Sequence, residues 1–194
     1  MRKIVVVGKS EFTLLQVAVH LSAWLLLLIL AGSYITNSLT VNPIQAVTQR
    51  TGYYALVFLA LSLACTPINT VFGFRQALSV RRTLGLYAFL FVAIHLWIFI
   101  GLDYGLEWQW IIPDILEKRY VIVGLLAGMI LLLLAITSTK GWMKRLGKSW
   151  KRLHRLVYLA AGLAILHYAW ANKGDLSNLQ GDIVEPLLWG IGVA

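Results

Sequence analysis

Histidines inside apolar segments are the residues of this sequence whose type and spacing could do chemistry. His95 and His167 lie within long apolar runs, and His154 lies at the basic edge of the run that carries His167. The fourth histidine, His20, lies in an apolar run near the N-terminus. An ionisable side chain in hydrocarbon has lost its water, so it is rare in a membrane span and usually functional. Imidazoles in that setting can ligate a metal ion or relay protons.

The composition indicates that these runs are membrane spans. The 194 residues are 59% hydrophobic and 13% charged, and the mean hydropathy is +0.77. Windows of about 19 residues predict five full spans and a partial sixth. The spans lie near 14–33, 53–72, 84–102, 120–137, 156–171 and 184–194. The sequence therefore predicts an all-α, multi-pass integral membrane protein. We expect a single domain over 1–194 without an internal repeat, and we place Gly52 at a loop end.

The basic residues lie mostly on one side of the predicted membrane. Thirteen of the 17 Lys and Arg fall in the N-terminus, the 73–83 loop and the 138–155 loop. They are Arg2, Lys3, Lys9, Arg75, Arg81, Arg82, Lys140, Lys144, Arg145, Lys148, Lys151, Arg152 and Arg155. Because cytoplasmic loops are enriched in Lys and Arg, the N-terminus is predicted to be cytoplasmic. The net charge of +9 is then explained by membrane topology, and a nucleic-acid partner is not needed to explain it.

Two of the histidines are predicted to lie at the same depth. His95 lies 13 residues past Arg82, and His167 lies 12 residues past Arg155. At about 1.5 Å per residue, these distances are roughly 20 and 18 Å from the inner edge. A transmembrane b-type haem needs such a pair, because its iron takes one imidazole on each face. A proton relay and a pair of packed core histidines are the alternatives, whereas no Cys or carboxylate at that depth completes a tetrahedral zinc site.

His154 indicates a second, inner site. Thirteen residues turn a helix by about 1300°, which leaves His154 and His167 roughly 140° apart, so they cannot share one metal ion. The inner positions of the third span are Arg81 and Arg82, which supply no imidazole. His20 is a candidate partner because it lies at a similar depth in the first span. The alternatives are that His154 is an interfacial cation, that His20 is satisfied by a polar neighbour, and that the arginines only signal topology.

The segment between Lys140 and Arg155 is basic and amphipathic. Apolar residues recur there at helical spacing among lysines and arginines. This pattern predicts one interfacial helix that binds anionic lipid headgroups. Docking of a reductase, and binding of haem propionates or of a flavin phosphate, are the alternatives.

Missing motifs limit the chemistry. Cys65 is the only cysteine, so covalent haem attachment, Fe–S clusters and disulfides are excluded as built-in features. With imidazole at both axial positions, the iron would have no open site for oxygen, which favours electron transfer. The sequence has no GxGxxG motif for a nicotinamide cofactor. We therefore expect electrons to come from a quinol or from a separate cytoplasmic flavoprotein.

Several motifs resemble one family closely. They are CTP at 65–67, SVRRTLGLYAF at 79–89, AIHLW around His95, KRY at 118–120, TSTKGWMKRLGKSWKRLHRLVYLAA at 137–161 and ILHYAWANKGD at 165–175. In this order they are similar to the haem-binding membrane subunits of bacterial protein-methionine-sulfoxide reductase systems, the YedZ or MsrQ family. The resemblance covers nearly the whole chain, but the family's sixth helix normally continues past Ala194.

The resemblance implies a ferric-reductase-like six-helix cytochrome of the bacterial inner membrane. Such a subunit passes electrons to a periplasmic molybdopterin enzyme that reduces methionine sulfoxide in oxidised envelope proteins. By resemblance, His95 and His167 match the ligands of one haem b, and His154 matches a third family histidine assigned to a second haem or to the inner cofactor region. The family is also described with FMN, for which no residue of this sequence can be matched. The implied role is electron transfer without catalytic residues of its own, and whether the chain is itself an enzyme stays open.

Two other functions remain open from the sequence. A stand-alone transmembrane reductase, for example of ferric iron, would be active without a periplasmic partner. A transporter that relays protons through its histidines would be colourless, whereas both reductase functions predict a red protein.

Overall fold

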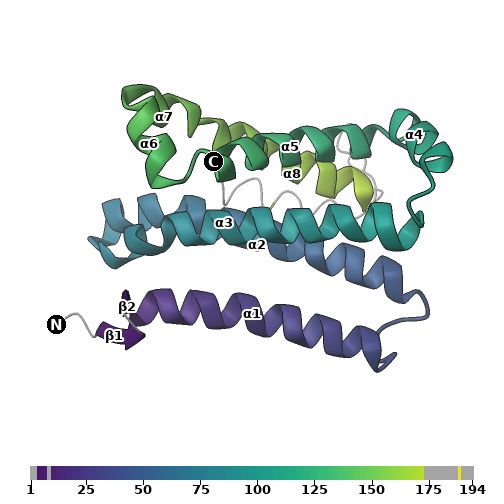
Figure 1. Ribbon diagram of the computed structural model, residues 1–194, viewed down its shortest axis with the longest axis horizontal. Coiled ribbons are helices and arrows are strands. Elements are labelled where there is room, and N and C mark those ends of the chain that lie inside the picture. Colours follow the sequence, from purple (N-terminus) through teal and green to yellow (C-terminus); the bar gives the residue numbers. More distant parts are fainter. Residues whose placement is uncertain (1–3, 8–9, 173–187, 189–194) are drawn as a thin grey trace.

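The computed structural model describes residues 4–7, 10–172 and 188, and consists mainly of long helices. Figure 1 shows three layers with roughly parallel axes. They are α1 (Leu14–Ile35), then α2 (Pro43–Phe72) with α3 (Gln76–Trp97), then α5 (Arg119–Ile136) with α8 (Leu156–Ala171). Helix α4 (Trp108–Glu117) lies at one end, and α6 (Lys140–Leu146) and α7 (Lys148–Leu153) lie at the other. We call these the α4 end and the α6–α7 end.

The all-α prediction is confirmed for the described part of the chain, apart from one short β-hairpin at the N-terminus. Strand β1 (Ile4–Val7) pairs antiparallel with β2 (Ser10–Thr13), with Ile4 opposite Thr13. The run IVVV is β-branched, which favours a strand, but a search for apolar spans does not detect so short an element. Helix α1 begins directly after β2 through a capping box, in which Thr13 and Gln16 each accept a hydrogen bond from the other's backbone N–H.

Helix α2 begins about ten residues before the predicted second span. The Asn42 side chain accepts a hydrogen bond from the backbone N–H of Gln45, and Pro43 occupies the first turn. Both features favour a helix start. The first turns of α2 are polar, so a hydropathy window excludes them. Consequently Gly52, which was placed at a loop end, lies inside α2.

Four helical segments among the described residues are long and apolar enough to cross a membrane: 14–35, 43–72, 76–103 and 119–136. The third combines α3 with the π-helix η1 (Ile98–Asp103). The predicted fifth span forms α8 with the expected bounds, but its 16 residues reach only about 24 Å, less than the roughly 30 Å of a hydrocarbon core. The predicted partial span near 184–194 lies outside the described residues, except for Leu188. The chain is a multi-pass membrane protein.

The basic segment forms two short helices instead of the single amphipathic helix that was predicted. Helix α6 ends and α7 begins at Gly147, which has a φ of 51°. Glycine adopts this left-handed backbone freely, and a helix cannot continue through it. The indole N–H of Trp150 in α7 donates a hydrogen bond to the carbonyl of Thr137 at 2.9 Å, which fixes α7 against the end of α5.

Small residues let the three layers approach, and aromatic rings join the two helices of the middle layer. Ala23 of α1, Ala88 of α3 and Ala160 of α8 are fully buried, and small residues at helix contacts permit close packing. Phe58 of α2 stacks on Phe91 of α3, with ring centroids 5.3 Å apart. These side chains belong to one buried apolar cluster to which α1, α2, α3, α5 and α8 all contribute.

Candidate functional site

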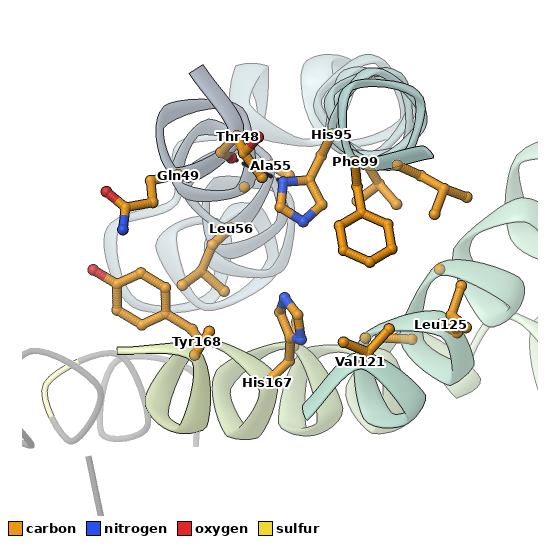
Figure 2. A pocket seen from close by; sticks show the side chains of 18 of the residues that line it. Thr48, Gln49, Ala55, Leu56, His95, Phe99, Val121, Leu125, His167 and Tyr168 are labelled. Atoms are coloured by element: carbon orange, nitrogen blue, oxygen red, sulfur yellow. Dashed lines mark hydrogen bonds between the residues drawn. The ribbon is translucent and has the colours of Figure 1, made fainter. Parts of the chain in front are cut away.

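His95 of α3 and His167 of α8 face each other between the two helix pairs. Their ring centroids are 6.0 Å apart, and the ring planes are inclined at 85°. Figure 2 shows the two imidazoles pointing toward one another. The structure thus brings together the two histidines that were predicted to share one depth.

A backbone carbonyl of the other helix in the same pair orients each imidazole. His95 Nδ1 lies 2.9 Å from the carbonyl oxygen of Thr48 in α2, and His167 Nδ1 lies 2.7 Å from that of Tyr120 in α5. A carbonyl can only accept a hydrogen bond, so each Nδ1 donates its proton and each Nε2 keeps a free lone pair. Histidines that ligate metals show this arrangement, because the hydrogen-bond acceptor at Nδ1 fixes both the tautomer and the direction of the ring.

A glycine makes room for each imidazole. A Cβ atom at Gly52 would lie 3.2 Å from His95 Cε1, and a Cβ at Gly124 would lie only 2.6 Å from His167 Nδ1. Any side chain at these two positions would therefore press on the ring.

The two helix pairs repeat this arrangement, whereas the sequence was expected to contain no repeat. Each carbonyl lies 47 residues before its histidine, and each glycine follows the carbonyl residue by four positions. Sequence reasoning missed Thr48, Gly52, Tyr120 and Gly124. The recurrence of glycine at the same distance before the two span histidines is the signal that could have identified them.

A cavity of about 1070 Å³ surrounds the histidine pair. This volume is at the upper end for ligand pockets. Its walls come from α2, α3, η1, α5 and α8, and Figure 2 shows Leu56, Phe99 and Val121 among the side chains around the pair. Apolar residues such as Leu59, Phe89, Met129 and Leu131 line it toward the α6–α7 end. Polar residues line it at the α4 end: Gln45, Gln49, Arg50, Lys118 and Asn172.

His154 lies apart from this pair, at the α6–α7 end. Its Nε2 is 3.3 Å from the hydroxyl of Ser138, and its Nδ1 is 3.1 Å from the carbonyl of Trp150. The imidazole stacks on the Trp150 indole with centroids 3.9 Å apart. Burial lowers the pKa of His154, and the positive charge of Arg81 acts in the same direction. The imidazole is therefore neutral at pH 7, the form that can ligate a metal.

The other predicted residues of the inner site are distributed over two helices. The guanidinium of Arg81 donates a hydrogen bond to the Thr66 hydroxyl at 2.9 Å, and its charge reaches His154. Arg82 is exposed on the surface of α3. His20 of α1 shares a hydrogen bond of 2.6 Å with the Tyr87 hydroxyl of α3. The structure thus places Arg81 close to His154 and places His20 against Tyr87.

An ion pair closes the α4 end beside the cavity. Lys118 Nζ lies 2.6 Å from Asp114 Oδ1. Burial raises the pKa of the Asp114 carboxyl, but the hydrogen bonds from Lys118 and Tyr104 and the charge of Lys118 together lower it by more, so the net shift is downward. Burial and the nearby Asp114 also raise the pKa of Tyr104 to about 12. Asp114 is therefore ionised and Tyr104 is protonated at neutral pH.

Asp114→Asn is expected to lower stability modestly and only above acidic pH. A folded-state pKa below the usual 3.8 gives stability that is present above that value and is lost as the pH falls through the lower folded value. The Lys118 side chain is 42% exposed, so the pair is worth about 0.5 kcal/mol. Thermal unfolding in detergent should show a Tm lower by about 1–2 °C at pH 7 and a difference that shrinks as the pH falls below 3.8. A Tm difference that does not change with pH would contradict the ion-pair explanation.

Comparison with known proteins finds one family model and several proteins that are similar to this chain. Residues 51–165 match the family model described as "Ferric reductase like transmembrane component". A protein of Rhodospirillum rubrum named "Protein-methionine-sulfoxide reductase heme-binding subunit MsrQ" is 41% identical over 182 residues, which are 93% of this chain and 84% of that protein. Proteins with the same name from Xanthomonas euvesicatoria pv. vesicatoria and Herminiimonas arsenicoxydans are 41% and 37% identical, over 79% and 95% of this chain and 71% and 83% of theirs.

Each of these three matches covers most of this chain and most of the relative. The helical membrane fold and the paired histidines are consistent with a ferric-reductase-like membrane protein. The chain belongs to the ferric-reductase-like transmembrane family and, within it, to the MsrQ subunits of protein-methionine-sulfoxide reductase systems. The resemblance found in the sequence is thereby confirmed.

Proposed function

We propose that this protein binds a b-type haem between His95 and His167 and carries electrons through it. The facing pair of imidazoles is the observation that supports this proposal most. A metal–imidazole bond is about 2 Å long and the ring centre lies about 1 Å beyond the nitrogen, so two imidazoles on opposite sides of one ion have centroids about 6 Å apart. The observed separation is 6.0 Å.

The donor set favours haem over a bare metal ion. Among the residues described, no group of three or more His, Cys, Asp and Glu side chains could hold a metal ion, whereas a structural or catalytic zinc needs at least three protein ligands. Haem supplies the equatorial nitrogens itself, so two imidazoles suffice. The cavity and its apolar walls suit a large, mostly apolar cofactor.

The protein's own residues keep the two imidazoles ready for ligation. The carbonyls of Thr48 and Tyr120 hold the Nδ1 protons, so both Nε2 atoms remain neutral electron-pair donors. When bound between His95 and His167, haem would supply a one-electron redox couple, which suits electron transfer. The apolar walls contributed by Leu59 and Leu131 limit the access of water.

The distribution of charge supports one orientation of the protein across the membrane. We place the N-terminus and the α6–α7 end in the cytoplasm, because 13 of the 17 Lys and Arg lie on that side. The α4 end is then periplasmic, and His95 and His167 lie in the outer half of the bacterial inner membrane. We further propose a single domain of six helices, in which α8 completes its span and a sixth helix follows.

The donor and acceptor follow from the family. We propose that electrons come from the quinone pool or a cytoplasmic flavin reductase and pass to a periplasmic molybdopterin-dependent methionine-sulfoxide reductase. The names of the relatives, which call them heme-binding subunits of a protein-methionine-sulfoxide reductase, support this assignment.

We propose a separate cofactor region around His154 at the α6–α7 end. Arg81 lies close to His154, and Arg82, His20 and the neighbouring basic helices α6 and α7 are further candidates for contacts there. A second haem and FMN are the candidate cofactors, the flavin by family resemblance. Lipid headgroups compete for the same basic surface.

The first test is the absorption difference between the dithionite-reduced and oxidised forms of the purified protein, with a pyridine haemochrome assay for haem per chain. We expect a sharp b-type spectrum with about one haem or more per chain. A colourless protein from haem-replete cells would overturn the proposal and favour a proton relay. Reduction of ferric iron without any periplasmic partner would instead indicate a stand-alone reductase.

A further inference from the structure

We propose that Arg50 and Lys118 bind the two propionate groups of the haem and so fix its propionate edge at the α4 end of the cavity. This inference rests on the haem site proposed above and adds the direction in which the haem is inserted. It also adds two residues, Arg50 and Lys118, to which we assigned no role from the sequence.

The cavity has two chemically different ends. Toward the α6–α7 end its walls are apolar, with Leu59, Phe89 and Leu131 among them. At the α4 end the walls carry Gln45, Gln49 and Asn172. All three come from helix ends that meet there, namely the start of α2 and the end of α8.

Haem b is amphipathic in the same sense. One edge of the macrocycle carries two propionate carboxylates, and the rest of its periphery is apolar. An ionised carboxylate buried without a partner is very costly, whereas a carboxylate at a polar, partly open rim keeps hydrogen bonds. The matching of polarity therefore directs the propionates toward the α4 end.

Two cations line that end, one from each helix pair. Arg50 follows Thr48 by two residues, and Lys118 precedes Tyr120 by two residues, so each cation flanks the carbonyl that orients one histidine. The spacing thus brings one positive charge to each side of the histidine pair. A haem ligated by both imidazoles has two carboxylates for these two charges.

The two cations are not equivalent. Lys118 is already paired with Asp114 at 2.6 Å, so part of its charge is balanced. Arg50 forms no ion pair within the described part of the chain, and its planar guanidinium matches a carboxylate with two parallel hydrogen bonds. Asp103 also lines the cavity and opposes anions there. We therefore assign the larger contribution to Arg50.

The test compares haemin with haemin dimethyl ester, in which both carboxylates are masked. Apo-protein in detergent is titrated with each form, and the dissociation constants are read from the bis-imidazole absorption. A charge-assisted contact at a half-exposed rim is worth about a factor of five to ten. We expect the wild type to prefer the free acid by about tenfold or more. The preference should fall about fivefold in Arg50→Gln, less in Lys118→Gln, and to near one in the double variant.

The control variants distinguish loss of positive charge at the cavity rim from general damage to the fold. Arg119→Gln removes an exposed cation next to Lys118 that does not line the cavity, so its preference should match the wild type. Arg50→Lys keeps the charge and should retain most of the preference. A substitution that damages the fold lowers the affinity for both haem forms equally, so the ratio of the two dissociation constants stays unchanged.

Equal binding of the two haem forms by the wild type would overturn this proposal while leaving the axial ligands intact. A preference that survives in the Arg50→Gln, Lys118→Gln double variant would also overturn it. Failure of the wild type to bind either form would instead refute the haem site itself.

Discussion

His95→Ala and His167→Ala are each expected to abolish the b-type spectrum of the haem that we propose between them. Each change removes one axial ligand, and a haem bonded to a single imidazole has an open axial position and only half of its protein ligation. Haem retained at this site should fall below about a tenth of the wild-type amount. The pyridine haemochrome assay gives the haem per chain, and the reduced-minus-oxidised spectrum shows whether any remaining haem is still six-coordinate.

The matched control for these variants is His154→Ala. His154 interacts with Ser138 and Trp150 at the α6–α7 end, so its loss should leave the haem held by His95 and His167 in place. A decrease in total haem without loss of that spectrum would support a second haem at His154. Equal loss of all haem in His154→Ala would refute the separation into two sites.

The pairing of His95 with His167 could be predicted from the sequence because it depends on helix geometry alone. Basic residues mark the inner edge of each span, and the fixed rise of a helix converts residue count into depth. Two histidines at one depth in two parallel helices then have only to face inward. Helix packing decides that rotation, and Ala88 and Ala160, each seven residues before its histidine and so on the same helix face, are both fully buried.

The residues that orient the two histidines or make room for them could not be predicted in the same way. Thr48 and Tyr120 act through backbone carbonyls, which every residue possesses, so their residue types carry no signal. Gly52 was misplaced because hydropathy detects the apolar part of α2 and not its polar first turns. The strands β1 and β2 were missed for a related reason, since a long window averages over four-residue elements.

Gly124→Ala is expected to displace His167 and to weaken haem binding strongly. The new Cβ would lie 2.6 Å from His167 Nδ1 and 2.8 Å from Cε1, so the ring has to move. The ring's hydrogen bond to the Tyr120 carbonyl, 2.7 Å long, would be strained or lost. Overpacking of this kind costs about 1–3 kcal/mol, which corresponds to a decrease in haem affinity of about five- to 150-fold. Haem titration of the apo-protein measures this decrease.

Alanine variants at two other glycines serve as comparisons for the expected loss of haem affinity. At Gly52 the Cβ would lie 3.2 Å from the His95 ring, so Gly52→Ala should produce a smaller decrease of the same kind. At Gly162, on the same helix as His167, nothing lies within 4 Å, so Gly162→Ala should bind haem like the wild type. The predicted order of affinities is therefore Gly162→Ala, then Gly52→Ala, then Gly124→Ala. If Gly124→Ala binds haem as tightly as Gly162→Ala does, the close approach of His167 to α5 is not what positions this ligand.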